Sequence, residues 1–135
     1  QDGGEMDIAI DFAGEIVERQ ELLNGTETVS LEGESADGHW AMLALVTWNI
    51  GLVSNVGEGD ITLSRDDGAE IFGALVRGDL AEASGDDGAA DHAMRLEYEI
   101  DGGSGVFEGA TGVCEAVGTL AAGAFRGRWV VTLGA

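Results

Sequence analysis

The sequence predicts an all-β fold, a single antiparallel up-and-down β-barrel of about eight strands, and two observations predict it. Apolar and polar residues alternate at a period of two along many short segments, which is typical of strands with one buried face. The chain holds 23 glycines and no proline, and the glycines fall between these segments, where tight turns are expected. No stretch keeps the apolar spacing of a long helix, so the choice lies between a sandwich and a barrel. We expect one domain over residues 1–135.

The first expected strand follows a flexible, polar and glycine-rich tail over residues 1–5. The side chains on one of its faces are Met6, Ile8, Ile10 and Phe12. Gly14 then marks a bend, so that residues 5–13 and 15–22 form either two strands or a single bent strand.

The remaining strands are separated by turn-forming residues. They are expected over roughly 26–34, 39–50, 58–65, 69–80, 93–101, 106–120 and 124–133. The run Asp66-Asp67-Gly68 indicates a hairpin between the fifth and sixth of the expected segments. A barrel of about eight strands has an interior that either fills with side chains or holds one small ligand.

The stretch 39–50 is apolar on both of its faces. Its first face carries Trp40, Met42, Val46 and Trp48. Its second face carries Leu43 and Leu45. A strand that is buried on both sides indicates that its outer face is covered by another subunit or by a terminal segment. We therefore expect a homo-oligomer, most simply a homodimer.

The chain is strongly acidic, with 26 aspartates and glutamates against six arginines and no lysine, for a net charge of −20. Such a surface repels phosphate backbones and anionic membranes, so we expect neither nucleic acid nor a membrane as partner. The acidity favours solubility or adaptation to salt over a specific recognition of cations. The longest apolar run, Ala41–Val46, is also far too short for a membrane span.

The single cysteine, Cys114, allows no internal disulfide and fits a reducing compartment, so we expect a cytoplasmic protein. Because Gln1 is not an initiator methionine, secretion stays open as an alternative. Cys114 has no histidine near it in sequence that would activate a nucleophile, so it is expected to act as a small buried apolar residue. The aspartate pairs within 84–91 lack the ligand spacing of a calcium loop, and the two histidines are far apart, so we expect no metal site.

The segment Asp101–Gly112 reads DGGSGVFEGATG. Its residues Gly102–Gly109 resemble a stretch of the plant allene oxide cyclases, Gly-Gly-Ser-Gly-Ile-Phe-Glu-Gly, and dirigent proteins carry looser versions. Clustered glycines permit a tight turn with positive φ, and Phe107 would then plug the barrel. A nucleotide-binding loop is the competing interpretation, and it fails because no helix follows to offer its N-terminus to a phosphate.

Two shorter stretches extend the resemblance. Glu15-Ile16-Val17-Glu18-Arg19 is similar to a Glu-Ile-Asn-Glu motif of the allene oxide cyclases, whose first Glu and Asn point into the cavity. The resemblance implies a polar catalytic role for Glu15, with Val17 in place of the Asn. Strict alternation from Phe12 would instead turn Ile16 and Glu18 inward.

The second stretch, residues 60–64, resembles the bacterial spirotetronate cyclases, small barrels that fold a linear polyene into a (4+2) cycloaddition product. In those enzymes the strand after the glycine turn presents large cavity-lining residues, including an Arg and a Trp. Here the corresponding positions are Cys114 and Ala116.

The resemblance implies a cofactor-independent cyclase or isomerase that shapes a small apolar, polyene-like or polyketide-like substrate inside the barrel. Such chemistry needs a shaped apolar cavity more than acid–base groups. The catalytic candidates are Glu15, Glu18 and Tyr98. The candidates for lining the substrate are Trp40, Met42, Trp48, Phe72, Phe107, Cys114 and Trp129.

Two alternatives remain open. One is a non-catalytic barrel that binds a lipophilic ligand, and the other is a secreted or structural barrel whose interior is filled. The same aromatic side chains would serve as core in the last case, so the contents of the barrel interior discriminate between these hypotheses.

Overall fold

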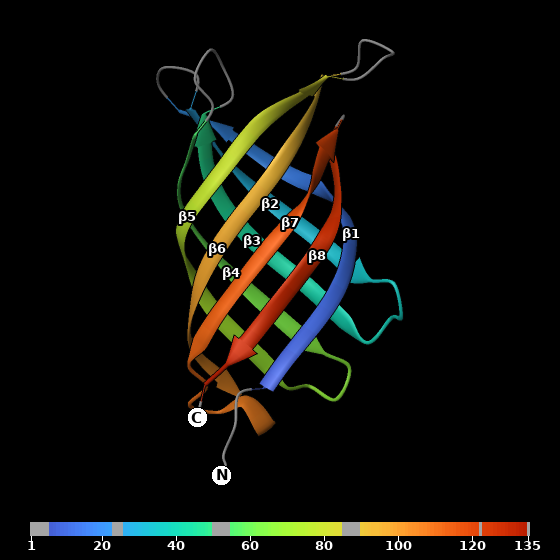
Figure 1. Ribbon diagram of the computed structural model, residues 1–135, viewed down its shortest axis with the longest axis vertical. Helices are drawn as coiled ribbons and strands as arrows, with labels where there is room; N and C mark the ends of the chain where they lie inside the picture. The colour runs from blue at the N-terminus through green and yellow to red at the C-terminus, as the bar shows by residue number, and fades with distance from the viewer. Residues whose placement is uncertain (1–5, 23–25, 50–54, 85–89, 122, 135) are drawn as a thin grey trace.

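The computed structural model describes residues 6–22, 26–49, 55–84, 90–121 and 123–134, and the expected tail over 1–5 lies outside them. Within the described residues the chain forms a closed barrel of eight strands in which each strand pairs with its neighbour in sequence and β8 pairs with β1 (Figure 1). The strands are β1 (Met6–Glu21), β2 (Thr26–Ser35), β3 (Trp40–Asn49), β4 (Asn55–Arg65), β5 (Glu70–Ser84), β6 (Ala90–Ser104), β7 (Gly112–Ala121) and β8 (Ala124–Leu133). All of these pairings are antiparallel, which confirms the predicted up-and-down barrel.

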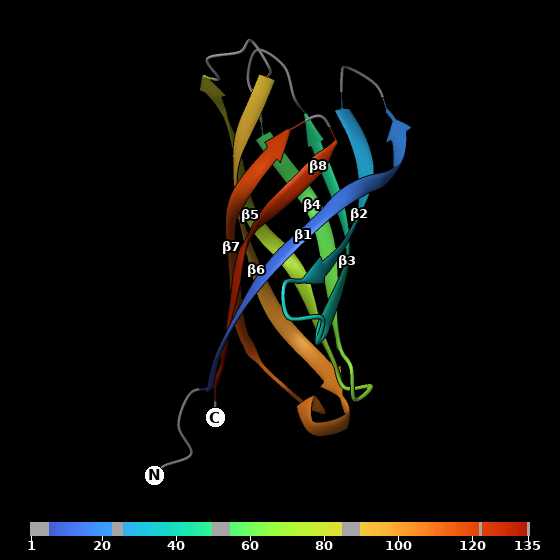
Figure 2. The same ribbon diagram turned by 90° about the vertical axis from the view of Figure 1, so that its right-hand side faces the viewer.

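The segments expected as strands 5–13 and 15–22 form one strand, β1, which curves round the barrel (Figures 1 and 2). Gly14 lies in the middle of β1, opposite Gly33 of β2. A Cβ on Gly14 would collide with the carbonyl oxygen of Glu32, so a side chain cannot be placed at this point of the curve. The interpretation of these residues as a single strand is therefore confirmed, and Gly14 is a point at which β1 and β2 approach too closely for a side chain to fit.

The glycine-rich segment after β6 is a tight turn. Gly105–Phe107 forms a short 3-10 helix, η2, so β7 begins at Gly112 rather than at the expected residue 106. Gly105 and Gly109 have φ values of +63° and +76°, in the left-handed region that glycine adopts readily. Phe107 is 5% exposed and packs into the barrel, as the sequence predicts.

Inward-facing side chains occupy the barrel as one apolar cluster. The largest fully buried members are Trp48, Trp129, Tyr98, Phe12, Leu31 and Ile61. Trp129 meets Phe12 and Phe125 edge to face, with ring centroids 5.4 and 5.8 Å apart. Aromatic pairs in this geometry contribute about 0.5–1.5 kcal/mol each beyond the burial of their surface. The interior is thus a packed hydrophobic core.

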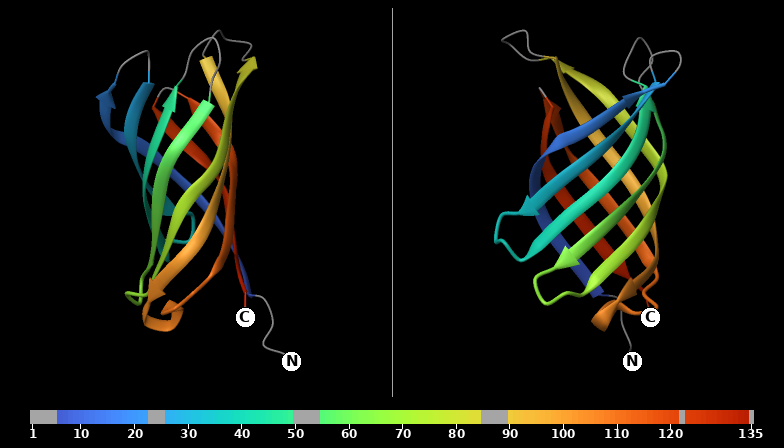
Figure 3. Two further views of the ribbon diagram at one scale, coloured as in Figure 1. Left: turned by 90° about the vertical axis from the view of Figure 1, so that its left-hand side faces the viewer. Right: turned by 180° about the vertical axis from the view of Figure 1, so that it is seen from behind.

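The two ends of the barrel differ. One end, called the lower end here, holds the 66–69 turn, the segment 105–111, the start of β1 and the end of β8 near the bottom of Figure 1, with Met6 paired to Leu133. The turn at 36–39, on the right of Figure 1, joins β2 to β3 on the same side of the barrel. Figure 3 shows the turn at 66–69 close to the segment 105–111 in both views. The strands end at the other, upper end at residues such as Glu21, Thr26 and Ala121. No helix among the described residues is long and apolar enough to cross a membrane.

Candidate functional site

Two polar atoms inside the barrel have no hydrogen-bond partner among the described residues: the Oη of Tyr98 and the Nε1 of Trp129. Both side chains are buried, with exposed fractions of 1% and 0%. We call them the donor pair. Tyr98 lies on β6 and Trp129 on β8, and the strand between them, β7, places Cys114 opposite Tyr98 and Ala116 opposite Trp129. Small side chains therefore line the inner wall between the two donors.

An unpartnered donor in an apolar interior is costly, since each loses its hydrogen bonds to water at about 1–3 kcal/mol. The barrel satisfies a comparable group elsewhere. The indole Nε1 of Trp48 donates to Glu27 Oε1 at 3.0 Å, and Arg19 Nη1 donates to the same oxygen at 2.6 Å. One buried indole thus has a carboxylate partner, whereas the indole of Trp129 has none in the described part of the chain.

Burial controls the protonation of the groups around the donor pair. It raises the pKa of Tyr98 well above the usual 10.0, and the nearby Cys114 and Asp60 add to the shift. Burial also raises the pKa of the Cys114 thiol to about 12. Tyr98 therefore keeps its proton and can donate a hydrogen bond, while Cys114 stays a thiol and is not activated as a nucleophile.

Both candidate carboxylates lie on the outer wall of the barrel. Glu15 and Glu18 are exposed, so the expectation that one of them points into the interior is corrected. Glu15 faces outward by simple alternation from the buried Phe12. Glu18 faces outward because of a β-bulge between Ile16 and Glu18, where the register against β2 shifts by one residue. Ile16 is half-buried and packs against the core, Val17 is 51% exposed, and the bulge returns Glu18 to the outside. Neither carboxylate reaches a ligand in the barrel.

Phe72 also faces outward, against the expectation that it lines the interior. Its neighbours Ile71 and Gly73 are buried on the inner side, while Phe72 is half-buried over Gly102 on the outside. The segment Ile71–Val76 is apolar at nearly every position, so alternation alone does not show which face is buried.

The other candidates lie inside the barrel and are buried: Trp40, Met42, Trp48, Phe107, Cys114, Trp129 and Tyr98. Trp40 and Phe107 close the lower end, with ring centroids 6.0 Å apart. The guanidinium of Arg65 lies over both rings, 5.9 Å from that of Trp40 and 5.0 Å from that of Phe107. Sequence reasoning missed Arg65, which stands next to an expected turn. A cation–π contact holds the Arg65 side chain over the Trp40 and Phe107 rings, which we call the aromatic cap.

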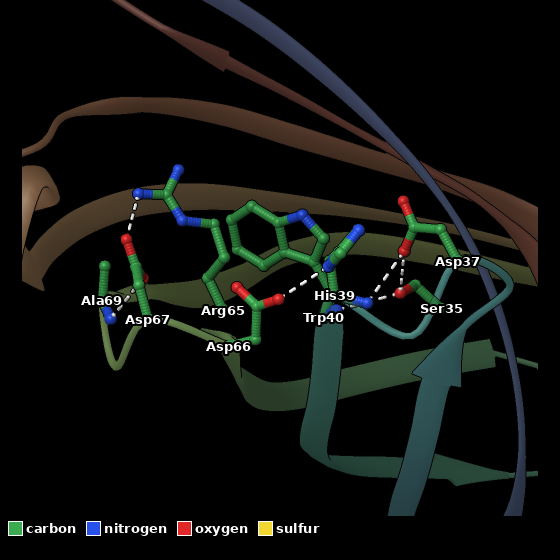
Figure 4. Close-up of polar contacts among 8 residues, drawn as sticks. All are labelled: Ser35, Asp37, His39, Trp40, Arg65, Asp66, Asp67 and Ala69. Carbon is green, nitrogen blue, oxygen red and sulfur yellow. Dashed lines mark hydrogen bonds and ion pairs between the residues drawn. The ribbon is translucent and has the colours of Figure 1, made fainter.

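Polar contacts between two turns brace the cap (Figure 4). The Nδ1 of His39, in the β2–β3 turn, lies 2.6 Å from Asp66 Oδ2 in the β4–β5 turn, and the backbone N–H of Asp66 donates to the His39 carbonyl at 2.8 Å. This hydrogen bond to Asp66 raises the pKa of His39 above 6.5, and the charges of Asp66 and Asp37 add to the shift. Next to it, Arg65 donates to Asp67, which lowers the pKa of that carboxyl to about 2. The lower end is thus closed by rings and held by ion pairs.

Comparison of the chain with protein-family models, with curated proteins and with solved structures finds no match. Within the described residues, no group of three or more histidine, cysteine, aspartate or glutamate side chains is arranged to hold a metal ion. The candidate site therefore rests on the donor pair and its surroundings.

Proposed function

We propose that the protein binds a small lipophilic molecule inside the barrel, through an acceptor group such as a carbonyl that takes a hydrogen bond from Tyr98 or Trp129. The observation that carries the proposal is the donor pair, two nine-tenths-buried donors without a described partner. A ligand oxygen that accepts a hydrogen bond from either donor would remove the cost of leaving that donor without a partner. The apolar surroundings would take the rest of the molecule.

The described residues close the lower end of the barrel to such a ligand. Trp40, Phe107 and Arg65 cover the lower opening, and the hydrogen-bonded turns fix that cover in place. Because the inward side chains already form one cluster, some of them must turn aside, and the wall of small side chains on β7 is where a ligand displaces least. The proposal therefore favours a small ligand over a bulky one.

Titration with β-ionone, a conjugated ketone, tests the proposal, with quenching of tryptophan fluorescence as the measurement. A conjugated hydrocarbon of similar size without the carbonyl is the matched ligand control. We expect the ketone to bind more tightly, and Tyr98→Phe to weaken it about tenfold, as loss of one buried hydrogen bond implies. Trp48→Phe, whose indole already has a partner, is the matched protein control and should change this preference little.

Equal binding of ketone and hydrocarbon to wild type and to Tyr98→Phe would overturn the role of the donor pair. Absence of binding by either compound, and by other conjugated ketones of similar size, would favour the hypothesis of a barrel with a purely structural interior.

A cyclase or isomerase acting on the bound molecule is a second candidate, and the protonation of Tyr98 favours it. A hydroxyl that stays protonated polarises a carbonyl without transferring its proton, and this assists a cyclisation whose barrier falls mainly through orientation. Glu15 and Glu18 take no part in it, since they lie outside. Incubation with linear polyenes that carry a terminal carbonyl tests the idea: recovery of the polyene unchanged, at the uncatalysed rate, removes it.

A further inference from the structure

The outer wall carries a groove of about 590 Å³ over β1, β2 and β3. Apolar side chains line part of it. Leu43 and Val17 are each 51% exposed there, and Ala13 and Ala41 lie beside them. Leu45, two residues along β3 on the same face, is 43% exposed. Exposed apolar residues that gather in a concave surface mark an interaction site more often than isolated ones do.

Three carboxylates border the same groove: Glu15, Glu32 and Glu34. Glu15 on β1 stands directly opposite Glu32 on β2. Like charges in directly opposed positions of a sheet destabilise it. None of the three has an ion-pair partner in the described part of the chain, and the described arginines that form ion pairs do so with other acidic residues. The groove thus combines an apolar lining with three carboxylates outside any described ion pair, and Arg126 lies beside it in a hollow that Glu34 also lines.

We propose that this groove is a docking site for a cationic amphipathic segment of a partner protein. The apolar side chains of that segment would pack on Leu43 and Val17. Its arginines or lysines would pair with Glu15, Glu32 and Glu34. Charge complementarity selects this occupant. A net charge of −20 attracts a basic segment over long range, and the local carboxylates fix where it docks. The apolar lining supplies contact area that a purely ionic interaction lacks.

A second copy of this chain fits the groove less well. A symmetric dimer through this face would bring the same three carboxylates of each protomer toward those of the other, and both protomers carry a net charge of −20. Such a contact would have to overcome both the local and the overall repulsion. A basic partner, rather than a second copy of the chain, therefore covers the apolar outer face of β3 in this proposal.

Calorimetric titration tests the proposal, using a capped octapeptide of alternating arginine and leucine as the probe. We expect binding that weakens as salt rises to about 0.3 M, because salt screens exposed charges. Glu32→Gln should weaken binding about two- to fivefold, the range for one exposed charge pair. Leu43→Ser should weaken it about tenfold through lost apolar burial.

Matched controls separate docking from general attraction to an acidic surface. Glu99→Gln on β6 makes the same change in net charge, and Val113→Ser on β7 removes an exposed apolar side chain, both outside the groove. Neither should change the affinity, and peptides with serine for leucine or glutamate for arginine should bind at least tenfold more weakly.

Three results would overturn the proposal. The first is an equal loss of affinity in Glu32→Gln and Glu99→Gln, and the second is no binding at low salt. The third is a sedimenting dimer that Leu43→Ser dissociates, since the face would then join two copies of the chain.

Discussion

Replacing Tyr98 by phenylalanine is expected to stabilise the free protein, although the mutation deletes a polar group from the proposed binding site. The hydroxyl is buried without a described partner, so its removal returns the desolvation cost of about 1–3 kcal/mol. The space it leaves is on the order of 10–15 Å³, which costs roughly 0.3 kcal/mol at about 24 cal/mol per Å³. The free energy of unfolding should therefore rise by about 1–2 kcal/mol.

Urea unfolding followed by far-ultraviolet circular dichroism measures this change. With a slope of about 2 kcal/mol per molar urea, the midpoint should move up by roughly 0.5–1 M. Trp48→Phe is the comparison, because it breaks the hydrogen bond to Glu27 and opens a larger gap, so that it should lower the midpoint. A Tyr98→Phe protein that is less stable than wild type by 1 kcal/mol or more would refute the reasoning, since it would mean that the hydroxyl is satisfied in the free barrel.

Three further predictions concern the wall and the lower end. His39→Gln should destabilise the protein below pH 6.5, where the wild-type imidazole is charged and bound to Asp66. The difference in stability from wild type should disappear as pH rises through the raised pKa of His39, and melting temperatures at pH 5.5 and 9 measure it. Gly14→Ala should cost about 1–3 kcal/mol in urea unfolding because its Cβ meets backbone, whereas in Gly57→Ala the nearest atom lies at 3.5 Å and the cost should be small. Glu32→Gln should raise the urea midpoint slightly by removing the repulsion from Glu15, and an unchanged or lower midpoint would contradict that pairing.

Alternation and turn chemistry were sufficient to predict an all-β fold of about eight strands. Period-two patterns located strands close to their observed bounds, and Gly14 was interpreted as a bend because a glycine inside a strand has few other purposes. The glycine-rich turn and the burial of Phe107 within it were both predicted, because the glycines and the aromatic ring stand next to one another in the sequence. Strand starts were less accurate, since residues 106–111 continue the composition of β7 but form a turn.

The candidate site was predicted only in part, and the reason is register. Residues on strands with one apolar face, such as Tyr98 and Trp129, were correctly predicted to point into the barrel. The bulge after Ile16 shifts every later side chain of β1 to the opposite face, and nothing in that stretch of sequence announces it. Phe72 was misplaced because both faces of its strand are apolar. Tyr98 and Trp129 lack hydrogen-bond partners because of what all eight strands place around them. The residues next to them in the sequence therefore do not reveal it.

Closure of the barrel joins the first strand of the chain to the last. The ion pair between Asp11 and Arg128 spans 117 residues, and β1 pairs with β8 along most of the length of β8. During synthesis, β1 must keep one edge unpaired until β8 has left the ribosome, and contacts of such long range slow folding. A chain that stops before residue 124 would expose the edges of both β1 and β7 to other molecules. Pairing of β8 with both β7 and β1 therefore converts an open sheet, whose free edges favour aggregation, into a closed barrel with no edges.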